Sequence, residues 1–238
     1  MHFNGLPERT MDELPMRTEN DEWKFWLLLT LLAMLAWIRF GYTKEFDDQF
    51  AAFRSWGMNQ QLLRELGVGA PFGVVLLNIF SITVISFYVF LLIQHFTYIF
   101  VQPGWLVMTA TFILVFAFFI LRYLLLKSIE VITTRGKELR LYIFYELQLN
   151  RVIGIFLFPL VILMEFSNPP VSLYAMYLSF VVIAALLIIR FIKGFNLGIS
   201  YFGKHAIHFL LYICALEIAP ILIVVRLLSD INPARLSF

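Results

Sequence analysis

One acid lies near the centre of the last long apolar stretch of the chain, residues 205–228. A helix over this stretch would cross a bilayer and place the carboxyl of Glu217 close to the midplane. A charged side chain at that depth costs roughly 2.5–3.5 kcal/mol on insertion scales. Pro220 follows three residues later and leaves the carbonyl of Leu216 without its usual helical donor. An acid beside an interrupted turn at mid-membrane is therefore the first candidate for a functional group.

Two interpretations of Glu217 stay open. It is either the titrating group of a proton-coupled process or a buried, protonated acid that hydrogen-bonds a neighbouring helix. In both cases we expect it to face the interior of the bundle, because lipid offers no polar partner. The partners that we expect on other helices are Asn78, Ser81, Arg122 and Arg151.

A polar stripe lies at the start of the same stretch. Its members recur every three or four residues and so share one helix face: Tyr201, His205, His208 and Tyr212. This face would suit a lipid headgroup, a proton or a metal, or it would anchor the helix at the interface, since tyrosine and histidine combine an apolar body with a polar tip. His208 and Glu217 are about 13 Å apart along a straight helix and on opposite sides, so no metal triad forms. We expect no metal and no cofactor.

The composition indicates that the bilayer is the solvent of this chain. Hydrophobic residues make up 61% and charged residues 14%, against about 25% charged in a soluble domain. The single cysteine, Cys214, excludes an intrachain disulfide. The basic residues are spread over several connections instead of lining one face, which argues against nucleic-acid binding.

The apolar runs predict an all-α membrane protein with about six transmembrane helices. We expect a polar, acidic tail at residues 1–22, a single membrane domain at 23–228 and a short tail at 229–238. The expected spans are 23–40, 71–95, 105–126, 144–165, 171–190 and 205–228.

The fourth span draws polar residues into the membrane. Its apolar core at 152–164 is shorter than the roughly twenty residues that a span needs, so the helix must begin near Phe144. This start places Glu146, Asn150 and Arg151 at the edge of the bilayer or inside it. Glu146 and Asn150 are four residues apart and share a face, which makes them further candidates for a site.

An amphipathic segment follows the first span. Phe46, Phe50 and Phe53 repeat at helical spacing between charged residues within 44–66. We expect one or two helices on the membrane surface with these three rings buried, or a segment that packs against the protein's own loops.

The distribution of basic residues predicts the orientation. Thirteen of the eighteen Lys and Arg residues fall in the connections after the first, third and fifth spans. By the positive-inside rule these connections face the cytoplasm and both termini lie outside.

The end of the chain resembles a known family. From Arg190 to Pro220 the sequence is similar to a domain-of-unknown-function family of integral membrane proteins from Bacteroidota. The residues that carry the resemblance are Lys204, His208, Tyr212, Cys214, Glu217 and Pro220. The resemblance implies the inner membrane of a Gram-negative bacterium, so the orientation predicted from the basic residues places both termini in the periplasm; it brings no activity.

Three functions are compatible with these residues. The one that we favour is a structural or assembly subunit of an envelope complex, without enzymatic activity, whose partners are the bilayer and other membrane proteins. The second is a proton-coupled, transporter-like protein that uses Glu217. The third is an enzyme that modifies a lipid or isoprenoid. No inverted repeat supports the second, and no acidic metal motif supports the third.

Overall fold

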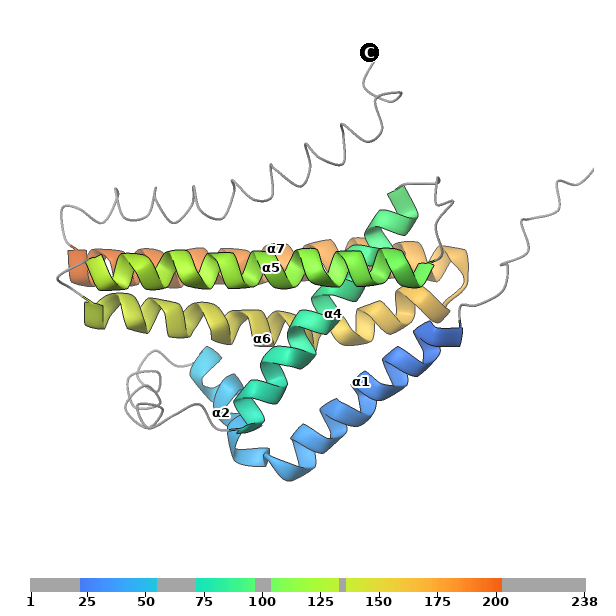
Figure 1. Cartoon of the computed structure of the whole chain (residues 1–238), viewed down its shortest axis with the longest axis horizontal. Helices are drawn as coiled ribbons and strands as arrows, with labels where there is room; N and C mark the ends of the chain where they lie inside the picture. Colours follow the sequence, from blue (N-terminus) through green and yellow to red (C-terminus); the bar gives the residue numbers. More distant parts are fainter. Residues whose placement is uncertain (1–21, 55–71, 97–103, 133–135, 203–238) are drawn as a thin grey trace, which may run out of the picture.

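The described part of the chain is entirely helical. The computed structural model describes residues 22–54, 72–96, 104–132 and 136–202. Within them run α1 (Glu22–Gly41), α2 (Thr43–Arg54), α4 (Phe72–Phe96), α5 (Gly104–Ile132), α6 (Gly136–Phe166) and α7 (Pro169–Phe202), shown in Figure 1.

Five of these helices are long and apolar enough to cross a membrane: α1, α4, α5, α6 and α7. Their apolar parts agree with the first five expected spans, so the predicted fold class is confirmed. The sixth expected span, which contains Glu217, lies outside the described residues. The early start of the fourth span is also confirmed, because the apolar part of α6 begins at Ile143.

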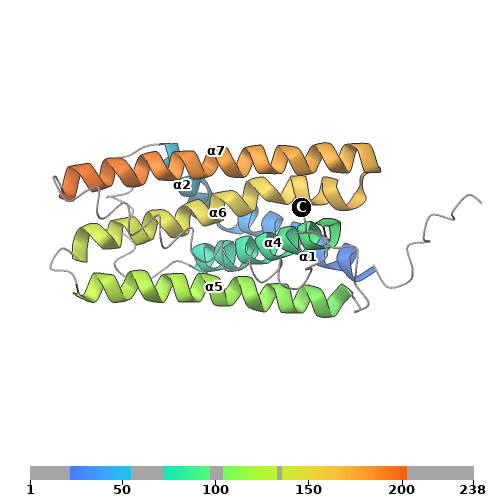
Figure 2. The ribbon, with the colours of Figure 1, turned by 90° about the horizontal axis from the view of Figure 1, so that it is seen from above.

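Helix α6 is the element around which the others assemble. It contacts α7, α4, α5 and α2. In Figure 1, α5, α6 and α7 run side by side while α4 crosses them obliquely, and Figure 2 shows α5 and α7 on opposite sides of α6. Between α6 and α7 only Ser167 and Asn168 are not helical, and Pro169 suits the first turn of α7, where a backbone N–H is not needed.

The apolar core fills the space between α1, α4 and α6. It contains Phe80 and Phe87 of α4, Leu157 and Val161 of α6, and Leu28 of α1. These side chains are almost fully buried, as the facing sides of packed helices require.

The three long helices α5, α6 and α7 continue beyond their apolar parts at one end of the bundle. The continuations are residues 129–132, 136–142 and 194–202, and Figure 1 shows these three ends together on the left. The positive-inside rule predicts that this end is cytoplasmic, and we call it the basic end.

Helix α2 contains residues 44–54 of the predicted amphipathic segment, which is the part that the structure describes. Its Phe50 ring lies 6.3 Å from the ring of Phe156 on α6, and Phe46 contacts Phe50 with ring centroids 5.2 Å apart. Between them, Gln49 is only 1% exposed. The observed contacts show Phe50 packed against a helix of the same chain, whereas the second interpretation had expected packing against loops. The side chain of Phe53 and the rest of the segment lie outside the described detail.

Candidate functional site

Glu146 joins three helices at the basic end of the bundle. It lies on α6 and is 4% exposed. Arg122 of α5 approaches its Oε1 atom through Nη2 at 2.6 Å, and Nη2 of Arg190 of α7 donates to the same oxygen. Two cations thus share one carboxylate, and we call these three residues the arginine clamp. A third cation, Lys193, lies 5.1 Å from the ring centroid of Tyr145 in the same region.

The packing of three helices depends on the arginine clamp. Charges withdrawn from water persist only when they are paired, and removing one partner of a buried pair typically costs 3–5 kcal/mol. Because the three partners come from three different helices, the cost falls on the packing of α5 and α7 against α6. The sequence predicted Glu146 as a candidate but did not predict its two partners.

Arg151 is the centre of a second buried polar group. It is 3% exposed, and its Nε donates to Oδ1 of Asn78 at 2.7 Å while Nη1 donates to Oε1 of Gln49 at 2.9 Å. The hydroxyl of Ser81 donates to the Arg151 carbonyl at 3.2 Å, and Nε2 of Gln148 donates to the Gln49 carbonyl at 2.9 Å. Arg151 therefore ties α6 to both α4 and α2.

Among the described residues, the guanidinium of Arg151 has amide partners and no carboxylate. Asn78 and Ser81, two of the partners expected for Glu217, both bind Arg151, and their contact with Glu217 stays a prediction because Glu217 lies outside the described residues. Asn150 lines a mainly apolar groove of about 180 Å³ between α4, α5 and α6, and Asn78 and Ser81 of the Arg151 group line the same groove.

Gly154 allows α4 and α6 to approach each other beside this group. A Cβ atom at Gly154 would lie 2.5 Å from the Ser81 side chain and 2.6 Å from its Cα atom. Cβ atoms essentially never approach other atoms that closely, so the two helices would have to separate. Gly154 thus sets the distance at which Ser81 reaches the Arg151 carbonyl.

A third charged group lies at the opposite end of the bundle. Lys24 of α1 is buried, and its Nζ atom is 3.3 Å from Oε1 of Glu165 on α6 and 3.3 Å from Oε1 of Gln94 on α4. The same ammonium lies 5.6 Å from the centroid of the Phe90 ring. This lysine group ties the start of α1 to the ends of α4 and α6.

Sequence reasoning missed Gln49, Lys24 and Glu165 as partners in these groups. Gln49 lies on the same helical face as Phe46, Phe50 and Phe53. Its position as a polar residue within an apolar stripe could have identified it from the sequence as a buried polar partner. Lys24 and Glu165 lie at helix ends that the predicted topology places on the same side of the membrane, which was also visible in the sequence.

The C-terminal candidates stay predictions. Tyr201 falls in the last turn of α7, but its side chain is outside the described detail. His205, His208, Tyr212, Glu217 and Pro220 lie outside the described residues. In the described ranges, no cluster of three or more histidine, cysteine or acidic residues is arranged to hold a metal ion.

Comparison with known proteins identifies a family and no activity. No curated protein and no solved structure matches the chain. A family model described as a domain of unknown function, DUF4271, matches residues 24–228 and so covers α1 to α7 together with the predicted sixth span. The chain therefore belongs to the DUF4271 family.

Proposed function

We propose that this protein is a structural or assembly subunit of a protein complex in a bacterial inner membrane, with both termini in the periplasm. The proposal rests on the observation that buried acids inside the bundle pair with cations on other helices. Glu146 forms ion pairs with Arg122 and Arg190, and Glu165 forms an ion pair with Lys24. These acids therefore join helices to one another. Such groups give a bundle a defined, rigid arrangement, which a scaffold for other subunits needs.

The outer faces of α5 and α7 supply surfaces for a partner helix. On α5, Ile113 is exposed, and on α7, Tyr177 and Val181 are exposed. Helices pack on such faces in a membrane by van der Waals contact and hydrogen bonding, without a hydrophobic driving force. Tyr177 adds a hydroxyl that can bond across such a contact.

In-cell photocrosslinking tests this proposal. A photoreactive amino acid replaces Ile113 or Tyr177, which are 60% and 63% exposed, and replaces the fully buried Val161 as a control. We expect a discrete protein adduct of constant mass from one exposed position and none from Val161. If neither exposed position gives a protein adduct while the variants still complement a deletion strain, the assembly function is wrong.

Proton-coupled transport is the second candidate, and Arg151 is the observation in its favour. A buried guanidinium with only amide partners among the described residues suits a counter-ion that gains and loses a proton. Glu217 is the acid that the sequence offers near the same depth. Under this function, Glu217→Gln abolishes proton-linked substrate uptake by the reconstituted protein but leaves the protein folded.

A further inference from the structure

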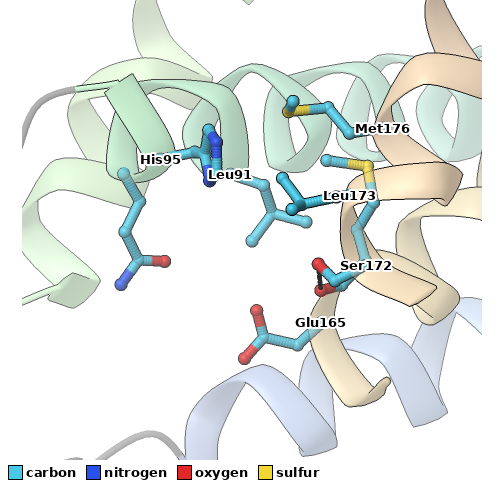
Figure 3. Close-up of a pocket in the computed structure, with 8 residues that line it drawn as sticks. Leu91, His95, Glu165, Ser172, Leu173 and Met176 are labelled. Atoms are coloured by element: carbon cyan, nitrogen blue, oxygen red, sulfur yellow. Dashed lines mark hydrogen bonds between the residues drawn. The ribbon is translucent and has the colours of Figure 1, made fainter. Parts of the chain in front are cut away.

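A pocket of about 250 Å³ opens beside the lysine group, where α4 and α6 end and α7 begins. Its polar lining consists of Gln94, His95, Glu165 and Ser172. Figure 3 shows Glu165 on one side of the hollow and His95 and Met176 on the other. The lining is therefore polar on part of its surface and apolar on the rest.

The wall of this pocket contains one buried anion, Glu165, and the cation that pairs with it, Lys24, contacts the lining residues Glu165 and Gln94 without lining the pocket itself. The side chains of Lys24 and Glu165 are 3% and 6% exposed, and their charged atoms are 3.3 Å apart. Gln94 accepts a hydrogen bond from the same ammonium. The pair is neutral as a whole, so a ligand with a net charge would enter without compensation, whereas a ligand that carries one charge of each sign would match it.

The depth of the pocket is that of lipid headgroups. Gln94 and His95 belong to the last turn of α4, Glu165 is the second-last residue of α6 and Ser172 is in the first turn of α7. The ends of spanning helices lie at the boundary between hydrocarbon and headgroups. Leu91 and Met176 line the pocket one turn deeper, on the side of the hydrocarbon.

We propose that this pocket binds the headgroup of a zwitterionic aminophospholipid. The primary ammonium of the lipid donates hydrogen bonds to the carboxylate of Glu165, and the nearby positive charge of Lys24, which contacts Glu165 and Gln94, attracts the phosphate of the lipid. A volume of about 250 Å³ is at the small end of ligand pockets, so it holds the headgroup while the acyl chains lie along Leu91 and Met176. This inference is independent of the proposed assembly function.

The chemistry of the site predicts a ranking among lipids. A choline headgroup has the same charges but no N–H donor for Glu165. A glycerol headgroup brings an anion and no ammonium. A hydrogen bond to a charged group contributes about 1.5–3 kcal/mol, so we expect the ethanolamine lipid to bind at least about tenfold more tightly than either.

Native mass spectrometry of the delipidated full chain in detergent tests this ranking. Phosphatidylethanolamine, phosphatidylcholine and phosphatidylglycerol with identical acyl chains are titrated separately. If the three lipids bind equally, the headgroup site is wrong. Soluble glycerophosphoethanolamine is added as a competitor; we expect weak competition, and if it binds as tightly as the lipid, the site takes a soluble ligand and the proposal is overturned.

Two variants locate the binding in this pocket. Leu173→Trp fills the pocket and leaves the Lys24–Glu165 pair intact, so the preference for ethanolamine should disappear. Leu187→Trp is its matched control, because Leu187 lies on the same helix and is 41% exposed, against 40% for Leu173. The preference should survive in this control; if Leu173→Trp also retains it, the site lies elsewhere.

A double variant tests the charges themselves. Lys24→Met with Glu165→Met removes both charges together, a change that folded proteins often tolerate because no unpaired charge is left. We expect a folded protein that binds the three lipids alike. An unchanged ethanolamine preference in this variant would contradict the role of the charged pair, and Leu173→Trp decides the matter if the double variant does not fold.

Discussion

At the scale of the residue, Glu146 is the most heavily constrained acid among the described residues. Glu146→Gln would remove the buried carboxylate that Arg122 and Arg190 share. We expect the free energy of unfolding to fall by about 3–5 kcal/mol, the typical cost of removing one member of a buried ion pair. Unfolding in mixed micelles with increasing denaturing detergent, followed by tryptophan fluorescence, measures this loss.

The control for this change is Asp47→Asn. Asp47 pairs with Arg39, but both side chains are at least half exposed, and exposed pairs contribute about 0–1 kcal/mol. A loss for Glu146→Gln no larger than that for Asp47→Asn would contradict the arginine clamp.

Glu217 gives a second prediction at this scale, from the sequence alone. If its role is structural, Glu217→Gln keeps a hydrogen-bonding side chain and should be nearly silent, whereas Glu217→Leu should lose assembly. The complex is measured on native gels. A Glu217→Leu variant that assembles normally would exclude a structural role for this acid.

At the scale of the element, the contact between α4 and α6 depends on the absence of a side chain at residue 154. Gly154→Ala places a methyl group 2.6 Å from the backbone of Ser81, which cannot move without its helix. We expect a loss of about 1–3 kcal/mol, the usual cost of overpacking, measured as a lower unfolding midpoint.

Gly104→Ala is the matched control for that change. A Cβ atom at Gly104 would meet its nearest neighbours at 3.7 Å and 3.9 Å, which is ordinary contact. A loss for Gly154→Ala no larger than that for Gly104→Ala would contradict the close approach of α4 to α6.

The elements were predictable from the sequence to different degrees. Apolar runs identified α1, α4, α5, α6 and α7, because a span needs a length of hydrocarbon-compatible residues whatever its neighbours are. The short apolar core of α6 even indicated that Glu146 and Arg151 enter the membrane. Pairings were not predictable, since Arg122, Glu146 and Arg190 meet only through the packing of three helices.

At the scale of the whole molecule, the orientation in the membrane is open to direct measurement. Cysteines at Gln102 and Asn168 should react with an impermeant thiol reagent from outside, and a cysteine at Lys137 should react only after the membrane is opened. The reason is the excess of basic residues in the connections of the predicted cytoplasmic side. Reversed labelling would invert the topology and place the lysine group at the cytoplasmic surface.

We propose that the buried charges of this protein hold its own helices together in the membrane and so provide a rigid bundle on which a partner assembles. Native mass spectrometry of the tagged full chain, extracted from its host membrane with a polymer and without detergent, tests it most directly. We expect one mass that corresponds to this chain with a second membrane protein in a fixed ratio, and we expect the Glu217→Gln variant to retain this complex. A chain that is extracted alone, and whose Glu217→Gln variant folds normally but no longer complements a deletion strain, would contradict it and favour proton-coupled transport.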